Sequence, residues 1–247
     1  MALLAAYNFD EASGDTVVDY SGNDYHFSLA GTNAARTGGH TNNGLTKSAA
    51  GGMPVLPVGL TAASQSANRT VMVWARGTGG IWYIRWQVDS INSGAWGILH
   101  VSPNIAVQAR NASGFVRPGA PIPGDGGWHH YAGTYDGTTA RFFLDGVEVA
   151  SAVLSPPMRT DADRIDLMEW SDANTSIDDL RIYDAALLEA EIATLMATPV
   201  TAPAADPVPT PAERVHKVAA ESRATGVAVE IRAAAVPAES RINIVEG

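Results

Sequence analysis

Residues 128–149 read WHHYAGTYDGTTARFFLDGVEV. Runs of aromatic and β-branched residues, which favour strands, are separated here by two Asp-Gly pairs, Asp136-Gly137 and Asp145-Gly146. An Asp-Gly pair between alternating runs is a strong signal for a two-residue hairpin turn. The pattern therefore predicts three consecutive antiparallel strands, at residues 128–135, 140–144 and 147–149.

Similar short runs extend in both directions along the chain. They lie at residues 4–9, 71–75, 81–88 and 177–183. In the run 81–88, alternation predicts two faces: a core face of Trp82, Ile84, Trp86 and Val88, and an opposite face of Tyr83, Arg85 and Gln87. A helical pattern appears at residues 185–197, with an apolar stripe of Leu187, Leu188, Ile192 and Leu195. The sequence therefore predicts an all-β sandwich or jelly roll with one short C-terminal helix.

The composition excludes several classes of function. The chain has 247 residues, no cysteine and a formal net charge of −10. The absence of cysteine excludes disulfides, thiolate-bound metals and thiol catalysis. The acidic balance argues against nucleic acid as a partner, and no apolar run approaches the ~18 residues of a membrane span. Residues 1–6 lack the basic start of a signal peptide, so we expect no leader.

Aromatic residues divide the chain into parts. All 18 of them lie between Tyr7 and Tyr183. Because aromatic side chains contribute the largest burial per residue, the sequence predicts a packed domain over residues 1–197. Residues 198–211, rich in Pro and Ala, are typical of an extended linker.

Residues 212–247 contain a nonapeptide repeat. Its last three copies align three residue types: Glu221, Glu230 and Glu239; Arg223, Arg232 and Arg241; Val227, Val236 and Val245. Within a copy, Glu and Arg lie on the same face of an extended strand, where they can pair with neighbouring chains. So few large apolar residues do not form a core. We expect an extended, non-globular arm that orders on assembly; the alternative is a solvated tail.

Several motifs in the first part of the chain resemble laminin-G-like (concanavalin A-like) jelly rolls. They are AYNFDE (6–11), DYSGN (19–23), RTVMVWAR (69–76), WHHYAGTYDG (128–137), FLDGV (143–147), IDDLRIY (177–183) and ALLEAEI (186–192). The resemblance covers residues 3–197 and implies the jelly-roll fold. At Leu188 the family usually has a serine that caps the last helix, so we expect a frayed or differently capped helix start.

Asp178 is the most informative carboxylate. Alternation places it on the face of Leu180 and Ile182, and a buried carboxylate needs a cation or several hydrogen bonds. The resemblance implies one structural calcium here, with Asp178 as a ligand, Asp10 as a neighbour and the carbonyl of Gly44 as a further candidate. The alternative is an aspartate that accepts backbone N–H groups at a strand end.

Other candidate side chains are fewer. His129 and His130 follow each other in a strand, so we expect one inward and one exposed histidine and no shared metal ion. Tyr83, and Trp96 in a Gly-flanked turn, are the candidates for exposed rings that stack on a ligand. The sequence lacks the common catalytic motifs: the carboxylate spacing of glycosidases, a Gly-x-Ser-x-Gly elbow, His-Glu-x-x-His and a phosphate loop. We therefore expect no enzyme.

The combination of these parts favours a virion structural protein. An adhesion-type β domain without a leader fits a chain made in the host cytoplasm and released by lysis. The Pro-Ala-Glu-Ser-Arg repeat also resembles tails of structural proteins from phages of high-GC actinobacteria. We expect a capsid decoration or minor tail protein whose arm contacts the major capsid or tail protein or self-associates. Its jelly roll can contact a host surface glycan. The alternative is a carbohydrate-binding or adhesion module of a cellular secreted protein.

Overall fold

The compact part of the chain ends at Thr201. The computed structural model describes residues 1–49, 52–77, 82–88, 93–169, 174–201, 230–232 and 243–245. The chain divides into two units, Met1–Thr201 and Ala202–Gly247. The hydrophobic core formed by the described residues belongs entirely to the first unit.

The described residues of the second unit form two short strands. β17 (Glu230–Arg232) pairs antiparallel with β18 (Asn243–Val245). Glu230 and Arg232 of the expected arm therefore lie in a strand. Its other candidate residues lie outside the described residues: Glu221, Arg223, Glu239 and Arg241.

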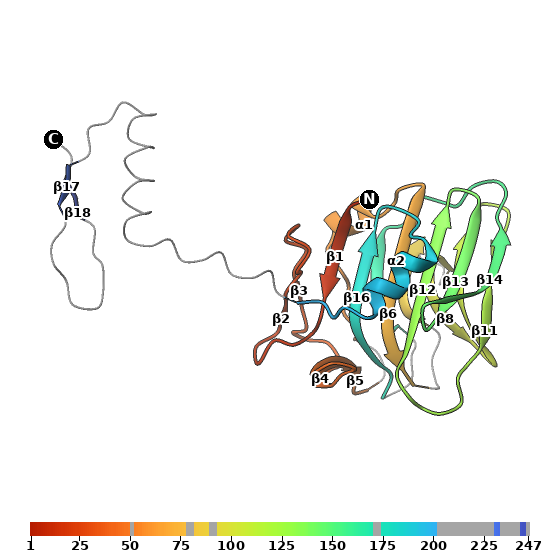
Figure 1. Ribbon diagram of the computed structural model, residues 1–247, viewed down its shortest axis with the longest axis horizontal. Coiled ribbons are helices and arrows are strands. Elements are labelled where there is room, and N and C mark those ends of the chain that lie inside the picture. Colours follow the sequence, from red (N-terminus) through yellow and green to blue (C-terminus); the bar gives the residue numbers. More distant parts are fainter. Residues whose placement is uncertain are drawn as a thin grey trace. The chain divides into compact units, whose positions relative to one another are not determined.

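The first unit is a sandwich of two antiparallel sheets (Figure 1), which confirms the all-β jelly-roll fold. The strands of the larger sheet follow the order β14 (Val147–Val153), β13 (Thr139–Leu144), β12 (His129–Asp136), β6 (Asn68–Arg76), β16 (Ser176–Tyr183), β5 (Asn43–Lys47) and β4 (Ala34–Gly38), and β1 (Leu3–Tyr7) also pairs with β16. The hairpins predicted at the two Asp-Gly pairs are confirmed. Asp145 and Gly146 have φ values of 50° and 84°, the left-handed backbone that such a turn requires.

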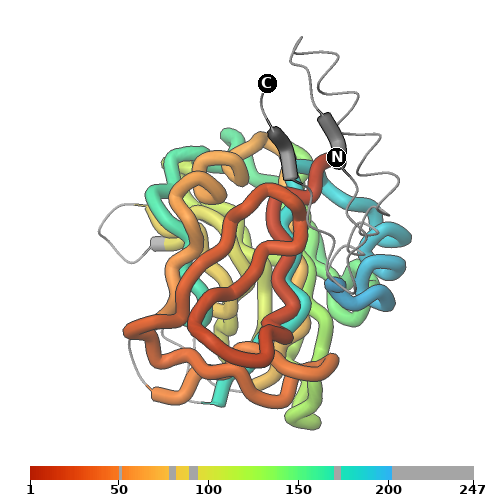
Figure 2. Tube along the Cα trace, turned by 90° about the vertical axis from the view of Figure 1, so that its left-hand side faces the viewer, coloured from red at the N-terminus to blue at the C-terminus, as the bar shows by residue number. Residues whose placement is uncertain are grey.

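The smaller sheet packs face to face against the larger one. Its strands follow the order β10 (Phe115–Val116), β9 (Asn104–Arg110), β8 (Ser93–Val101), β7 (Trp82–Val88) and β15 (Arg164–Leu167), and β11 (Gly119–Pro121) also pairs with β9. A ribbon of β2 (Thr16–Val17) and β3 (Phe27–Ser28) and the short helix α1 (Val58–Ala63) complete the unit. Figure 2 shows the N-terminal strands gathered on one side of the sandwich.

The main core lies between the sheets because each sheet turns alternate apolar residues inward. Val71 and Val73 of β6 are buried there together with Ile105 and Val107 of β9. Within each strand, the residues that alternate with these point to the opposite face of the sheet. Met72, for example, belongs to a separate cluster on the outer face of the larger sheet.

Helix α2 (Glu189–Met196) covers part of that outer face. Its Ile192 and the preceding Leu187 pack against Met72, Ala132, Phe143 and Tyr183. The helix start is differently capped, as expected: Glu191 accepts the backbone N–H of Leu188 at 2.7 Å. Leu188 is 70% exposed and so does not belong to the predicted apolar stripe. Neither helix in the described part of the chain is long and apolar enough to cross a membrane.

The residues that follow α2 are docked on the sandwich. Val200 is buried; its N–H donates to Asp179 Oδ1 at 2.7 Å, and its carbonyl accepts from Asn8 Nδ2 at 3.1 Å. The carbonyl of Thr198 accepts a hydrogen bond from Arg181. We call residues 198–201 the C-terminal strap. They belong to the compact unit, although the sequence pattern places them in the linker.

A β-bulge changes which residues of β7 face the main core. The pairing of β7 with β8 shifts between Trp82 and Ile84, which makes Tyr83 an extra residue. The extra residue reverses the alternation. Tyr83 therefore joins the main core with Ile84, whereas Trp82 packs with Leu99 and Ala106 in a separate cluster. The prediction of Trp82 on the core face and Tyr83 on the opposite face is wrong.

Candidate functional site

The part of the outer face beyond α2 carries a row of polar and aromatic side chains. The strand register places Asp178 of β16 opposite Trp74 of β6, and Trp74 opposite His130 of β12. Directly paired residues on neighbouring strands point to the same face. The three side chains therefore lie side by side across the sheet, on the face opposite the main core.

Asp178 reaches this face because β16 is irregular. Its pairing with β6 shifts between Asp178 and Arg181, and Asp179 has a left-handed backbone with a φ of 46°. The irregularity reverses the alternation, so Leu180 and Ile182 join the main core and Asp178 does not. The expectation that Asp178 shares their face is therefore wrong. Asp178 is nevertheless buried, with 1% of its surface exposed.

The turn between β4 and β5 connects two aspartates. Asp178 Oδ2 accepts the N–H of Thr41 at 2.9 Å, and Asp10 Oδ1 accepts the N–H of Asn43 at 2.9 Å. Asn42, between these two donors, has a left-handed backbone with a φ of 52°. Backbone strain of this kind clusters at ligand sites.

Gly44 allows this turn to pack closely against β16. A Cβ atom at Gly44 would lie 2.9 Å from the Cα of Gly39 and 2.9 Å from the carbonyl oxygen of Ile177. Gly39 in turn approaches Asp178, because a Cβ at Gly39 would lie 2.6 Å from Asp178 Oδ2. The structure thus brings together all three residues that the family resemblance implies for a metal site: Asp10, Gly44 and Asp178.

The charge of Arg181 acts on the carboxylates beside this turn and opposes the rise in the pKa of Asp179. No basic side chain among the described residues forms an ion pair with Asp10, Asp178 or Asp179. Burial raises the pKa of Asp178 to about 7; the N–H of Thr41 opposes this rise, and the charges of Asp179 and Asp10 add to it. Burial also raises the pKa of Asp179. The site therefore favours a cation or a proton.

This set of donors fits a hard divalent cation such as calcium. Calcium accepts oxygen ligands from carboxylates, amides and backbone carbonyls, all of which occur at the turn. No group of three or more His, Asp or Glu side chains that could hold a metal occurs in the described part of the chain, so backbone oxygens would have to complete the coordination. Asp178 Oδ1 also accepts the N–H of Asp179 at 2.8 Å. Both oxygens of Asp178 thus accept backbone N–H groups. This is the arrangement expected for the alternative interpretation, in which Asp178 binds backbone N–H groups and no metal.

Two partly exposed tryptophans lie beside the turn. His40, itself exposed, stacks on Trp74 with ring centroids 3.6 Å apart. The guanidinium of Arg76 lies over Trp128, 4.9 Å from its ring centroid, and the His40 ring meets Trp128 edge-on at 6.4 Å. We call this group the rim site. It consists of His40, Trp74, Arg76 and Trp128, together with Asp10 and Asp178.

Several nitrogen atoms in or beside the rim site lack partners. Both ring nitrogens of His130, Nε1 of Trp74 and Nη1 of Arg181 are buried without a hydrogen-bond partner among the described residues. Burial, with the Arg181 charge adding, lowers the pKa of His130 to about 3, so its ring is neutral at pH 7. A buried polar atom without a partner costs about 1–3 kcal/mol. These atoms are buried below the surface, so they are not contact points for a ligand on this face.

A histidine between two aspartates fixes the loop that carries Trp128. His129 Nδ1 lies 2.8 Å from Asp145 Oδ2, and Nε2 lies 3.1 Å from Asp125 Oδ1. Burial lowers the pKa of His129, but these hydrogen bonds outweigh burial and raise it above its usual value. His130 is fully buried, as expected for one of the two histidines. The side chain of His129 is only 18% exposed, so the prediction of an exposed histidine is not met.

The two predicted stacking residues do not belong to the rim site. Trp96 is fully buried, at 0% exposure, because it pairs with Trp86 on the core side of β8. Tyr83 is 5% exposed and stacks on Tyr131 with centroids 5.8 Å apart. The prediction that these two rings are exposed is wrong.

The sequence pattern could have identified only one of the two rim tryptophans. Trp74 and Trp128 are the tryptophans of the described residues that are not fully buried. The alternation that turns Val71 and Val73 inward also turns Trp74 outward, so its position follows from the pattern. Trp128 precedes its strand, and its exposure depends on the loop.

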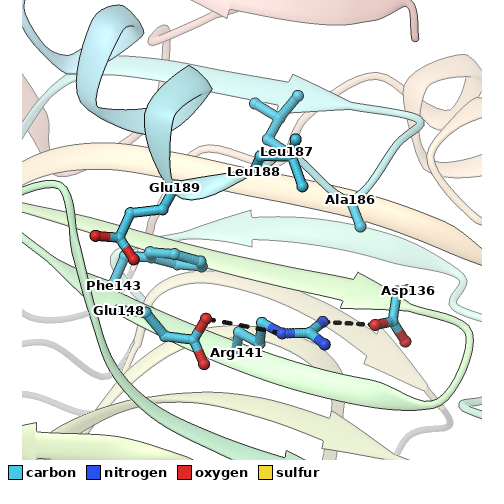
Figure 3. A pocket seen from close by; sticks show the side chains of 8 residues that line it. All are labelled: Asp136, Arg141, Phe143, Glu148, Ala186, Leu187, Leu188 and Glu189. Atoms are coloured by element: carbon cyan, nitrogen blue, oxygen red, sulfur yellow. Dashed lines mark hydrogen bonds and ion pairs between the residues drawn. The ribbon is translucent and has the colours of Figure 1, made fainter.

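A separate pocket of about 260 Å³ lies where the start of α2 meets β13 and β14 (Figure 3). Arg141 lies between Asp136, at 2.5 Å, and Glu148, at 3.7 Å, and Leu187 lines the opposite wall. Phe143, the aromatic residue of its lining, is 1% exposed. The pocket therefore offers no ring face, and carboxylates already neutralise its arginine.

The sequence and the fold together place the chain in a family. Residues 58–193 match the family described as the concanavalin A-like lectin/glucanases superfamily. The chain belongs to this superfamily. The resemblance to laminin-G-like jelly rolls is thus confirmed over this region. The match does not include the repeat arm, and no curated protein matches the sequence.

Solved structures share the fold of this superfamily member. The binding domain of Paraclostridial Mosquitocidal Protein 1 is 14% identical, with a TM-score of 0.63 over 78% of this chain and 51% of that chain. The binding domain of Botulinum Neurotoxin DC, in complex with SialylT, is 13% identical, with a TM-score of 0.65 over 80% and 51%. Domain 4 of AbnA, an extracellular arabinanase of Geobacillus stearothermophilus, in complex with arabinotriose, is 21% identical, with a TM-score of 0.59 over 78% and 98%. The chain spans about half the length of the first two.

Proposed function

We propose that this superfamily member is a glycan-binding module and that the rim site binds the glycan. The observation that carries the proposal is the convergence of His40, Trp74 and Trp128, from three separate elements, beside Arg76. Aromatic rings provide apolar faces on which sugar rings stack, and guanidinium, imidazole and carboxylate groups bind hydroxyls.

The ligands of similar structures suggest which glycans to test. Domain 4 of AbnA holds arabinotriose, and the Botulinum Neurotoxin DC domain holds SialylT. These ligands belong to those proteins. For this chain they make arabino-oligosaccharides and sialylated glycans the first probes. We propose that the chain binds such glycans without cleaving them.

We further propose a structural role for calcium beside the rim site. Asp178 would bind the ion, with Asp10 and backbone carbonyl oxygens of the β4–β5 turn nearby. The raised pKa of the buried Asp178 carboxylate supports the proposal, because a cation would supply the ion pair that this carboxylate lacks among the described residues. An ion here would hold in place the turn that carries His40.

A glycan array probed with the full chain tests glycan binding. For a neutral glycan, we expect Trp128→Ala to weaken binding about tenfold because it removes a stacked ring. The matched control is Phe115→Ala, which truncates a ring of 48% exposure on the other sheet and should leave binding unchanged. Equal binding by the Trp128 variant contradicts the rim site. A shortened glycan, detected by mass spectrometry, contradicts binding without cleavage.

We also propose that residues 212–247 anchor the module to a phage virion through its capsid or tail protein. The nonapeptide repeat supports this, and it lies outside the compact unit that ends at Thr201. Deleting residues 202–247 keeps the core and the C-terminal strap, so the shortened chain should fold yet be absent from purified particles, as measured by immunoblot. Normal incorporation of the shortened chain contradicts anchoring by the arm. Absence of the full chain from the particles contradicts the virion role and favours the alternative, an adhesion module of a cellular secreted protein.

A further inference from the structure

Two arginines and an exposed phenylalanine form a basic surface at the edge of the smaller sheet. Phe115 of β10 pairs with Arg110 of β9, and it is 48% exposed. The guanidinium carbon of Arg117 lies 4.2 Å from the Phe115 ring centroid, and that of Arg110 lies 5.7 Å from it. Two positive charges therefore share one ring.

Neither arginine is neutralised by a carboxylate. Among the described residues, Arg110 and Arg117 form no ion pair, whereas several other arginines of the unit each pair with an acid: Arg36, Arg85, Arg141, Arg159 and Arg164. Partial burial and then the charge of Arg110 lower the pKa of Arg117. In the described part of the chain, Arg69, Arg76 and Arg181 also form no ion pair, but Arg69 and Arg181 are buried and Arg76 lies over Trp128. Arg110 and Arg117 differ from them because both lie over the ring of the exposed Phe115.

The hairpin that carries this surface is held rigidly. Asn111, at its turn, accepts the N–H groups of Ser113 and Gly114, each at 2.9 Å, and donates to the carbonyl of Pro156 at 2.7 Å. Arg117 Nε donates to Gln108 Oε1 at 2.7 Å. The Arg117 side chain is thus anchored through Nε, and its residue remains exposed.

The neighbouring charges leave the surface positive. The backbone N–H of Arg159 donates to the carbonyl of Arg110 at 2.9 Å, which brings a third arginine close. The guanidinium of Arg159 is paired with Asp161 at 2.6 Å, so this arginine adds no net charge. The excess charge belongs to Arg110 and Arg117.

We propose that Arg110, Phe115 and Arg117 form a binding site for the anionic groups of an acidic polysaccharide. A guanidinium held by stacking and by its Nε bond is positioned to bind a carboxylate or sulfate through two N–H groups. Because the site is an open hairpin surface, a polymer that repeats its anionic group fits it better than a single small ion. This site lies on the smaller sheet and is separate from the rim site, which lies on the larger sheet.

Surface-immobilised polygalacturonate and heparin, with dextran as the neutral reference, test this site on the full chain. We expect the double variant Arg110→Gln, Arg117→Gln to bind about tenfold more weakly to at least one acidic polymer, because charge-assisted hydrogen bonds are lost. Arg117→Lys, which keeps the charge but loses the planar fork, should give an intermediate affinity. Thermal melts confirm that each variant is folded.

Two controls distinguish binding at this site from a general effect of net charge and from binding at the rim site. Arg159→Gln and Arg117→Gln change the net charge equally, but Arg159→Gln leaves the site intact. Only Arg117→Gln should therefore weaken binding. Trp128→Ala, in the rim site, should bind the acidic polymers normally. Equal losses in Arg159→Gln and Arg117→Gln overturn the proposal, as does retention no greater than on dextran. Binding to phosphatidylglycerol vesicles but to neither polymer also overturns it.

Discussion

Asp178 is a buried carboxylate whose pKa in the folded protein, about 7, lies well above its ordinary value of 3.8. The folded protein holds this proton more tightly than the unfolded chain does, which stabilises the fold at low pH. That stabilisation is complete below pH 3.8 and is lost as the pH rises through about 7. With EDTA present, we expect this group to lower the free energy of unfolding by about 4 kcal/mol over that interval, measured by urea denaturation.

The variant Asp178→Asn is the control for this pH dependence. It removes the titrating group, so its free energy of unfolding should fall much less over the same interval. Excess calcium chloride should raise stability above pH 7 in the original chain and leave the variant unchanged. A flat profile for the original chain in EDTA contradicts the raised pKa of Asp178. An equal effect of calcium on both chains contradicts Asp178 as a ligand.

Gly44 is a second residue whose role can be measured. A Cβ there would lie 2.9 Å from two backbone atoms, which cannot move aside as the end of a side chain can. Gly44→Ala should therefore lower the free energy of unfolding by about 1–3 kcal/mol. Gly124→Ala, where a Cβ meets nothing within 4 Å, is the matched control and should be nearly neutral. Equal thermal stability of the two variants would show that the turn does not need this close approach.

The C-terminal strap is the element whose removal should affect the compact unit most clearly. Val200 is 6% exposed and its backbone makes two hydrogen bonds with side chains. Burial of a valine contributes about 1.5–3 kcal/mol, and each hydrogen bond about 1 kcal/mol. The free energy of unfolding of a chain that ends at residue 197 should therefore be about 3–5 kcal/mol lower than that of a chain that ends at 201. Chemical denaturation measures both, and equal midpoints would refute docking of the strap.

The hairpins could be predicted from the sequence, but the irregular strands could not. Asp136-Gly137 and Asp145-Gly146 mark their turns through local backbone preferences alone. A bulge, by contrast, adds one residue without changing the local composition, yet it reverses which side chains face the core. Alternation alone therefore assigns Tyr83 and Asp178 to the wrong faces.

The candidate site likewise contains residues that could be predicted from the sequence and residues that could not. The family resemblance places Asp10, Gly44 and Asp178 at one metal site, and the structure brings them to one turn. His40 and Trp128 come from loops whose positions depend on tertiary contacts, such as the bonds from His129 to Asp145 and from Thr41 to Asp178. No local pattern encodes such contacts. The aromatic half of the rim site therefore appears only in three dimensions.

Across the compact unit, the outer face of the larger sheet serves two purposes. Helix α2 and its apolar partners cover one part of it and extend the hydrophobic packing. Another part carries the rim site, where His40 is exposed and Trp74, Arg76 and Trp128 are partly exposed. The main core between the sheets is independent of both. This division separates the surface on which we propose glycan binding from the main core.

The indole N–H signals of the full chain, labelled with nitrogen-15 tryptophan, test glycan binding at the rim site most directly. A neutral glycan selected on the array is titrated in, and single Trp→Phe variants assign the signals. We predict saturable shifts for Trp74 and Trp128, and unchanged signals for the buried Trp86 and Trp96. Saturable glycan binding that leaves the Trp74 and Trp128 signals in place would contradict the account.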